Sequence, residues 1–209
     1  LHIHEPNSPS FSMLSLVNSV GPIVATYHSA ATDSLALKLG TPFLRKYLER
    51  IRGGIAVSEV ARRWQVEQLG GDPVLIPNGV RVGDFESCPA ASSLPEIPPR
   101  REGFYRLVFL GRFDESRKGF DVLLDALPAI CAEIPQLEVC VVGDGDVAAA
   151  RRKAGRNADV LHFVGRLSED AKASILADAD AYIAPQRGGE SFGIVLVEAM
   201  AAGAPVISS

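Results

Sequence analysis

The residues best suited to chemistry lie in loops that directly follow apolar runs. After the run RLVFLG, the chain places three cations, Arg112, Arg117 and Lys118, ahead of a predicted helix. The first turn of a helix offers unpaired N–H groups and the positive end of the helix dipole, so cations beside it predict a diphosphate site. Asp114 and Glu115 nearly neutralise this loop, and a solvated charged loop is therefore the alternative interpretation.

A second such loop reads GGESFG at 188–193 and leads into an apolar segment that contains Glu198. The glycines permit close approach of the backbone to a ligand, and Glu190 or Ser191 is expected at the helix N-terminus. An ionised carboxylate in an apolar segment is costly without a partner, so Glu198 is expected to contact ligand hydroxyls, a cation or backbone groups. The alternative is that Glu190 favours the helix dipole and Glu198 lies on an exposed stripe.

The third candidate is His28, which ends the run PIVATY and precedes Ser29. An imidazole there could donate to a substrate group, or polarise it, near neutral pH, although an ordinary hydrogen-bonded loop histidine is the simpler alternative. We interpret His2, His4 and His162 as structural, because they lie within strand-like runs. No Ser/His/Asp order, P-loop or HExxH spacing is present, which argues against the familiar hydrolase, nucleotidase and zinc-protease chemistries.

The elements that must position these loops alternate between apolar strand-like runs and segments with helical periodicity. Continuous apolar runs, rather than strict alternation, favour a parallel sheet covered on both faces. Ser58 is expected to cap one of the helices. Strands are predicted at 1–4, 22–28, 53–58, 73–80, 106–112, 137–143, 160–165, 181–185 and 205–209, and helices near 10–20, 42–52, 58–69, 119–133, 146–154, 169–177 and 191–202.

This alternation predicts an α/β protein with two Rossmann-like parallel-sheet domains that face a cleft. The predicted boundaries are 1–83 for a first domain, 84–104 for a connection rich in proline and serine, and 105–209 for a second domain. Ligands of such sheets bind beyond the carboxyl ends of the strands, where the three candidate loops are expected. Both ends of the sequence read as buried strands, so we expect an internal piece of a longer protein.

Composition narrows the classes of function. The 209 residues are 47% hydrophobic and 22% charged, as in an ordered globular protein, and the net charge of −4 leaves no large basic face for nucleic acid. The three cysteines form no CxxC or metal-ligand spacing, so we expect neither structural zinc nor disulfides, and a reducing cytosol fits. No apolar run approaches the roughly 18 to 20 residues needed to span a bilayer.

Taken in order, several motifs resemble those of family-four glycosyltransferases, which have the GT-B fold. They are GRFDESRKG, VVGDG, FVGRL and GGESFGIVLVEAMAAGAPVI with its Glu-x7-Glu spacing. Within that family, LHIHEPNSPS, GPIVATYHS, IAVSEVARRWQ, IPNGV and RKGFDVLLDALP resemble the actinobacterial phosphatidylinositol mannosyltransferases. The resemblance extends over almost the whole chain and is weakest at 86–104.

The resemblance implies a retaining transfer of mannose from GDP-mannose to the inositol ring of phosphatidylinositol at the cytoplasmic face of the membrane, with no cofactor and no required metal. Arg112 and Lys118, with Arg117, would hold the donor diphosphate, and His28 would lie near the transferred sugar. Further donor contacts would come from the following residues: Leu167, Glu169, Lys172, Gly189, Glu190, Ser191, Phe192, Gly193, Ile194 and Glu198. Asn7 and Ser29 would contact the acceptor.

One position departs from this pattern. The mannosyltransferases carry a lysine five residues after the active-site histidine, where this chain carries Asp33, and an acid there is less suited to an anionic phospholipid. Two alternatives stay open: the same fold with another donor, such as a UDP-sugar, or another acceptor, and a non-catalytic module that binds a nucleotide sugar. The sequence does not reveal the oligomeric state.

Overall fold

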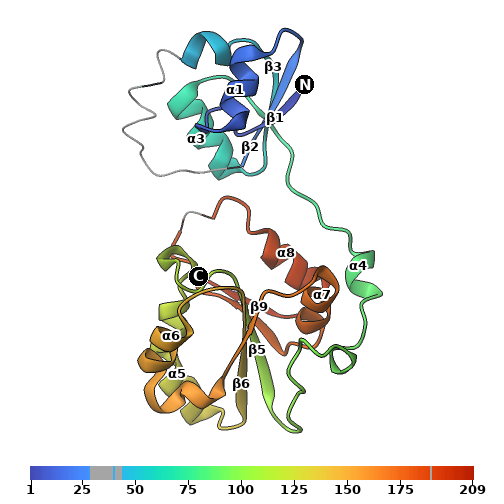
Figure 1. Cartoon of the computed structure of the whole chain (residues 1–209), viewed down its shortest axis with the longest axis vertical. Coiled ribbons are helices and arrows are strands. Elements are labelled where there is room, and N and C mark those ends of the chain that lie inside the picture. The colour runs from blue at the N-terminus through green and yellow to red at the C-terminus, as the bar shows by residue number, and fades with distance from the viewer. Residues whose placement is uncertain (29–39, 41–43, 189) are drawn as a thin grey trace. The chain divides into compact units, whose positions relative to one another are not determined.

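The computed structural model describes residues 1–28, 40, 44–188 and 190–209. Contacts divide the chain into two units, one formed by Leu1–Gly79 with Gly189–Gly193 and the other by Val80–Gly188 with Ile194–Ser209. Each unit contains a parallel β-sheet with helices packed on it (Figure 1). The α/β class with two parallel sheets, expected from the alternating runs, is confirmed.

The sheet of the first unit has the order β1-β2-β3-β4, and all its described pairings are parallel. On one face, Leu16 of α1 is fully buried and packs in a cluster with Ile3 and Ile23 of the strands. Ser58 caps α3 as predicted, because its hydroxyl accepts a 3.1 Å hydrogen bond from the N–H of Ala61. The elements are β1 (His2–His4), α1 (Phe11–Asn18), β2 (Ile23–Tyr27), β3 (Ile51–Ala56), α3 (Glu59–Leu69) and β4 (Val74–Leu75).

Two predictions in this unit were wrong in extent. The strand expected over 73–80 is limited to β4, since Pro77 has no N–H to donate to a ladder and the chain continues as a loop. The helix expected over 42–52 overlaps β3, which begins at Ile51 and pairs with Ile23 of β2. The β-branched side chain of Ile51 suits a strand better than a helix end, and pairing with the sheet decides the boundary.

The second unit has a five-stranded parallel sheet in the order β7-β6-β5-β8-β9. Figure 1 shows α5 and α6 on one face of this sheet and α7 and α8 on the other. The chain therefore builds outward from β5 in one direction and then crosses back to build outward in the other. The elements are β5 (Tyr105–Leu110), α5 (Phe120–Glu133), β6 (Leu137–Val142), α6 (Val147–Ala154), β7 (Leu161–Gly165), α7 (Glu169–Ala177), β8 (Ala181–Ala184), α8 (Ile194–Ala201) and β9 (Val206–Ser208).

Successive side chains of β5 and β6 fill two separate hydrophobic clusters. Val108 and Cys140 pack with α7, whereas Phe109 and Val141 pack with α5 and α6. Because side chains of a strand point to alternate faces, a continuous apolar run places hydrophobic groups on both sides of the sheet. This explains why the strands read as unbroken apolar runs.

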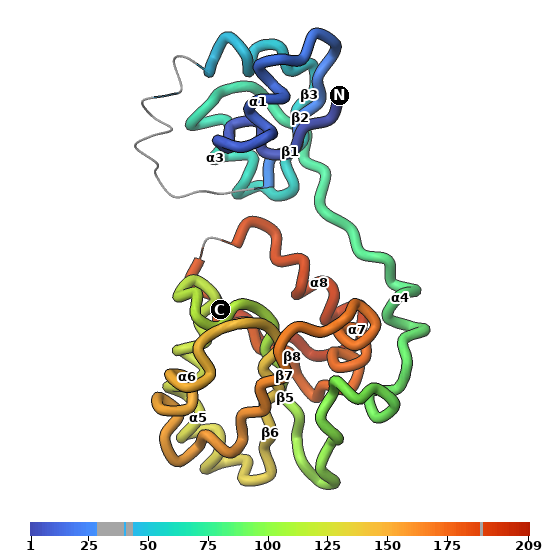
Figure 2. Tube along the Cα trace, viewed as in Figure 1, coloured from blue at the N-terminus to red at the C-terminus, as the bar shows by residue number. Residues whose placement is uncertain are grey.

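The proline-rich segment after the first unit packs on the second unit. Its short helix α4 (Gly83–Glu86) contributes Phe85 to the cluster around α7, and Ile97 joins the same cluster at 4% exposure. Figure 2 shows this segment running beside α7. Buried apolar side chains therefore fix part of the predicted connection to the second unit.

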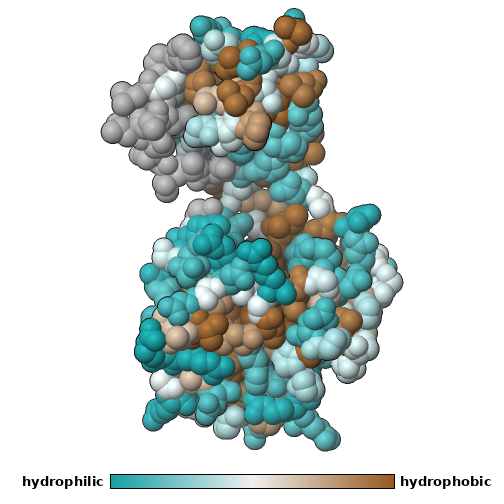
Figure 3. Space-filling view, in the orientation of Figure 1, coloured by the Kyte–Doolittle hydropathy of each residue, from teal (hydrophilic) through white to brown (hydrophobic). Residues whose placement is uncertain are grey.

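The surface of the chain is mixed in character. On the face shown in Figure 3, hydrophilic side chains cover much of the second unit, with apolar groups scattered among them. Scattered apolar exposure is ordinary for a folded protein. Within the described residues, no helix has both the length and the apolarity needed to cross a membrane.

Candidate functional site

Strand order in the second unit brings two of the candidate loops together. β5 lies between β6 and β8, so the order of the sheet reverses between β5 and β8. The loops after the carboxyl ends of these two strands diverge at such a reversal and leave a crevice in which ligands of open α/β sheets bind. The cation loop follows β5, and the chain leaves β8 at this crevice before it enters the glycine-rich loop, whose residues 190–193 are grouped with the first unit.

Close approach of these loops depends on glycine. Gly119 has a φ of +68°, and a Cβ atom added there would lie 1.5 Å from the carbonyl oxygen of Pro185, which follows β8. The N–H of Arg187 donates a 2.9 Å hydrogen bond to the carbonyl of Arg117. Any side chain at position 119 would therefore push the cation loop away from the loop after β8.

The cations of the first loop are partly paired within the loop itself. The guanidinium of Arg112 lies 2.9 Å from one oxygen of Glu115, and that of Arg117 lies 2.8 Å from the other. Arg112 is exposed, Lys118 is half-buried, and both follow β5 within eight residues. The loop is thus neither an open cation cluster nor a simple solvated loop: a diphosphate that binds here must compete with the Glu115 carboxylate.

The glycine-rich loop ends later than predicted. The helix expected from residue 191 begins at Ile194, so Glu190, Ser191 and Phe192 precede it rather than form its first turn. Gly193 adopts a φ of +75°, a left-handed conformation that ends the loop and is incompatible with a continuous helix. Gly189 lies outside the described residues.

The buried carboxylate of α8 has a cation as its partner. The ammonium of Lys172 lies 2.9 Å from Glu198 and 2.7 Å from Glu169, and the side chains of Lys172 and Glu198 are 17% and 13% exposed. Burial by itself lowers the pKa of Lys172, but the hydrogen bonds to the two carboxylates raise it above its ordinary value. Three residues expected around the donor nucleotide therefore form one cluster, beside the half-buried Leu167 that follows β7.

In the first unit, the structure adds residues that the sequence interpretation treated as structural. His28 directly follows β2, and its Nε2 lies 2.7 Å from Nδ1 of His4 at the end of β1. The N–H of His28 donates to a carboxylate oxygen of Glu5. Burial, followed by the neighbouring His4, lowers the pKa of His28 below its ordinary value, which keeps the ring neutral near neutral pH.

Asn7 lies in the same loop as Glu5 and is 9% exposed. Its side-chain oxygen is buried and has no hydrogen-bond partner among the described residues. Ser29, the other residue expected at the acceptor, and Asp33 lie outside the described residues. Asn7 and His28 follow neighbouring parallel strands and therefore lie at the same edge of the sheet.

The two halves of the chain match two family descriptions. Residues 105–209 match "Glycosyl transferases group 1", and residues 1–83 match "Glycosyltransferase Family 4". The chain belongs to the group 1 glycosyl transferases. Its loops after β5, β7 and β8 are therefore those of a glycosyltransferase.

Two curated relatives and one solved structure are similar to this glycosyltransferase chain. It is 53% identical, over its entire length, to the "Phosphatidyl-myo-inositol mannosyltransferase" of Mycolicibacterium smegmatis, and it covers 53% of that protein. It is 38% identical, over 89% of its length, to the "GDP-mannose-dependent monoacylated alpha-(1-6)-phosphatidylinositol monomannoside mannosyltransferase" of Corynebacterium glutamicum and covers 51% of it. The HepE structure of Anabaena in complex with UDP and glucose has a TM-score of 0.72 at 21% identity, covering 90% of this chain and 52% of that one. The chain thus spans about half the length of these relatives.

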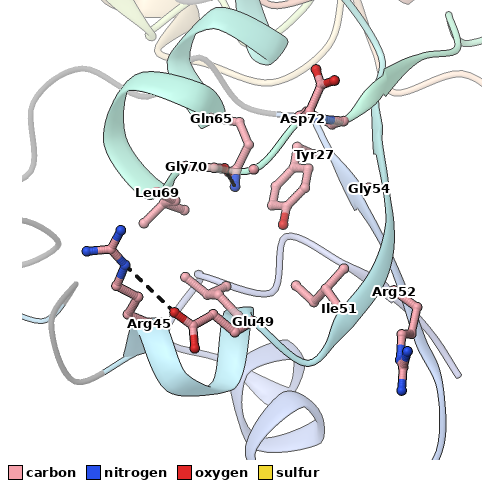
Figure 4. Close-up of a pocket in the computed structure, with 13 residues that line it drawn as sticks. Tyr27, Arg45, Glu49, Ile51, Arg52, Gly54, Gln65, Leu69, Gly70 and Asp72 are labelled. Carbon is pink, nitrogen blue, oxygen red and sulfur yellow. Dashed lines mark hydrogen bonds and ion pairs between the residues drawn. The ribbon is translucent and has the colours of Figure 1, made fainter.

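A separate cavity of the glycosyltransferase chain lies within the first unit. It has a volume of about 410 Å³ and is lined by residues between the end of β2 and the loop before β4. Figure 4 shows Tyr27 and Gln65 on one side and the Arg45–Glu49 ion pair on the other. Burial, followed by Glu5, raises the pKa of Tyr27 to about 12, so its hydroxyl stays protonated. None of the predicted site residues is among the described residues that line this cavity.

Sequence patterns missed the partners of these site residues. His4 and His28 are 24 residues apart, and Lys172 and Glu198 are 26 apart. The available signal was the topology of parallel strands, which brings the residues that follow adjacent strands to one edge. For His4 and His28, that rule shows that the loops are neighbours only once the strand order is known, and it does not show which side chains touch. It does not apply to Lys172 and Glu198, which lie on the helices α7 and α8.

Proposed function

We propose that the protein to which this chain belongs is a retaining glycosyltransferase that moves mannose from GDP-mannose to the inositol ring of phosphatidylinositol. The observation that carries the proposal is the placement of Arg112, Lys118 and Glu190 in the two loops that diverge at the β5–β8 reversal. The 53% sequence identity of the whole chain to a phosphatidyl-myo-inositol mannosyltransferase supports the choice of acceptor. The named donor of the corynebacterial relative supports GDP-mannose.

The chemistry assigned to the loops after β5, β7 and β8 is donor binding and stabilisation of the leaving group. When the bond from the sugar carbon to the diphosphate breaks, the electron pair stays on the diphosphate, and its negative charge increases. Arg112 and Lys118 would supply positive charge and hydrogen bonds to that diphosphate, as the N–H groups at the start of α5 would. Glu190 and the backbone of 190–194 would hold the sugar, and Glu198 with Lys172 and Glu169 would hold the nucleoside.

The first unit would supply the acceptor side. An inositol hydroxyl would provide the donor that the buried oxygen of Asn7 lacks among the described residues. His28, held neutral, would interact with the transferred sugar or the attacking hydroxyl. We propose that the enzyme binds the cytoplasmic face of the membrane peripherally, because its acceptor is a lipid.

Alanine substitution tests the diphosphate site. We expect Arg112→Ala and Lys118→Ala in the full-length enzyme to lower kcat by about 10²- to 10³-fold, the range found when a group that stabilises a developing oxyanion is removed. Arg152→Ala, which removes an exposed cation of α6, serves as the matched control and should leave kcat unchanged. Near wild-type transfer by both loop variants would show that the diphosphate is held elsewhere.

The choice of donor needs its own test. Thermal unfolding of the full-length protein with GDP, UDP, ADP and their sugars should show a selective rise in Tm with GDP and GDP-mannose, because a ligand that binds the folded state stabilises it. A selective rise with the UDP compounds would contradict the mannose donor. Donor binding without any transfer to phosphatidylinositol would instead favour a non-catalytic binding module.

A further inference from the structure

Two consecutive residues at the end of β1 hold His28. His4 contacts the imidazole of His28 through a 2.7 Å nitrogen–nitrogen hydrogen bond, and the carboxylate of Glu5 accepts the backbone N–H of His28. Glu5 adopts a φ of +50°, which is uncommon for a residue other than glycine. The connection after β1 is thus bent in a way that places both side chains against the residue after β2.

The hydrogen bond between the two rings restricts the chemistry of His28. One imidazole must donate a proton and the other must accept it with a lone pair, so at least one of the two rings is neutral. Because Nε2 of His28 is occupied by His4, Nδ1 is the ring nitrogen that the described residues leave for a ligand. Which ring donates decides whether Nδ1 of His28 carries a proton or is free to accept one.

The rings of His4 and His28 also lie edge to edge in nearly the same plane, as an in-plane hydrogen bond between ring nitrogens requires. The centroids of His4 and His28 are 5.0 Å apart with an interplanar angle of 21°, and those of His2 and His4 are 4.7 Å apart. His2 is anchored in turn, since its Nε2 lies 2.7 Å from the hydroxyl of Thr26. The in-plane hydrogen bond from an anchored His4 therefore holds the His28 ring in its orientation.

We propose that His4 is a positioning residue of the transfer reaction, which sets the orientation and the tautomer of His28 so that Nδ1 faces the substrate. The proposal rests on the proposed role of His28 in transfer. His4 itself contacts His28 and not the substrate. Because a single intramolecular hydrogen bond contributes modestly, we expect its loss to lower kcat roughly three- to tenfold.

The test compares two substitutions of His4 in the full-length enzyme, assayed with GDP-mannose and vesicles that contain phosphatidylinositol. His4→Phe keeps a flat ring but removes both nitrogens and with them the hydrogen bond to His28, and we expect it to lower kcat about three- to tenfold with unchanged KM for both substrates. His4→Asn places an amide atom at the position of Nδ1 and should restore most of kcat. His162→Phe, which alters a histidine of the second unit, is the control for a general effect of replacing a histidine.

A double variant separates the two proposals. In a protein that already carries His28→Ala, adding His4→Phe should have no further effect on kcat, because the residue through which His4 acts is absent. If His28→Ala lowers kcat and His4→Phe does not, the positioning role is wrong while the role of His28 stands. If His28→Ala has wild-type kcat, the proposed role of His28 fails and the positioning role fails with it.

A spectroscopic measurement on the wild-type protein covers the case in which His4→Phe does not fold. Nitrogen chemical shifts of the imidazole of His28 should report one dominant neutral tautomer near neutral pH, as the bond to His4 requires. A mixture of both tautomers, as in a freely solvated histidine, would overturn the proposal.

Discussion

At the scale of single residues, Glu115 determines how much positive charge the cation loop offers. Its two carboxylate oxygens lie 2.9 Å from Arg112 and 2.8 Å from Arg117, which partly neutralises the loop. The side chain of Glu115 is 25% exposed, so these pairs are less screened by water than pairs on an open surface. A diphosphate must displace or share these guanidinium groups.

Removal of the Glu115 charge should therefore strengthen binding of the nucleotide. We expect Glu115→Gln to lower the Kd for GDP about three- to tenfold, with the larger effect at low salt, where charge interactions are least screened. Titration calorimetry at two salt concentrations measures this change. Asp125→Asn, which breaks the 2.9 Å pair of Asp125 with Lys153 away from the loop, is the control. Weaker binding by Glu115→Gln would show that the carboxylate organises the cations rather than competes for them.

His162 is a residue whose burial couples stability to pH. Burial is the largest cause that lowers the pKa of His162, and its Nε2 has no hydrogen-bond partner among the described residues. Since the pKa in the folded protein lies below the ordinary value of about 6.5, the unfolded chain binds the proton more readily. The free energy of unfolding should therefore decline as the pH falls through that value.

Substitution of His162 should remove this dependence. We expect His162→Phe to raise the free energy of unfolding by about 1 kcal/mol, because it removes an unsatisfied buried nitrogen, and to flatten the decline between about pH 7 and pH 5. His162→Asn should also flatten the decline, without the gain in stability. Urea unfolding across this pH range measures both effects. An unchanged slope in both variants would show that other groups produce the acid sensitivity.

At the scale of elements, β5 and β6 are joined by a buried ion pair at the edge opposite the candidate site. Arg106 and Glu138 are partners in the strand register, their side chains are 1% and 2% exposed, and their charged groups lie 2.6 Å apart. Arg106 also contacts Asp178 at 2.9 Å and the carbonyl of Pro98 at 2.9 Å. The pair thus links β5 and β6 to the segment that precedes β5.

Breaking this pair should destabilise the second unit without affecting the chemistry. We expect Glu138→Gln to lower the free energy of unfolding by about 3 kcal/mol, because it leaves the buried guanidinium of Arg106 without its main counter-charge. Arg101→Gln removes the exposed partner that lies 3.5 Å from Glu138 and should cost less than about 1 kcal/mol. Urea unfolding measures both variants. Equal losses of unfolding free energy in the two variants would show that the buried pair stabilises the protein no more than the exposed contact does.

At the scale of the whole molecule, the two sheets have different roles in the proposed reaction. The second unit carries the cations and the buried lysine cluster, and the first carries the pair of histidines, Asn7 and residues 190–193 of the glycine-rich loop. The proposed enzyme needs residues from both units, so neither unit alone would carry out transfer. Charge stabilisation is assigned to protein cations, and we propose that no metal is required.

Chelation tests that assignment. We expect transfer by the full-length enzyme to be unchanged by EDTA, since Arg112 and Lys118 would stabilise the diphosphate as it leaves. The assay is the initial rate with GDP-mannose and phosphatidylinositol vesicles before and after chelation. Loss of activity that Mg²⁺ or Mn²⁺ restores would contradict the assignment.

The sequence by itself determined most of the local elements and the loops that are candidates for the site. Apolar runs, helical periodicity and the cap at Ser58 are set by interactions between residues near in the chain, so α7 could be predicted over 169–177 as observed. The order β7-β6-β5-β8-β9, the pairing of Arg106 with Glu138 and the contacts of His28 with His4 were decided by the tertiary structure. These features depend on packing between segments far apart in sequence, and a local pattern carries no information on which strand becomes a neighbour or in which register. The residues of the candidate site could therefore be predicted from the sequence, while the partners that orient and neutralise them could not.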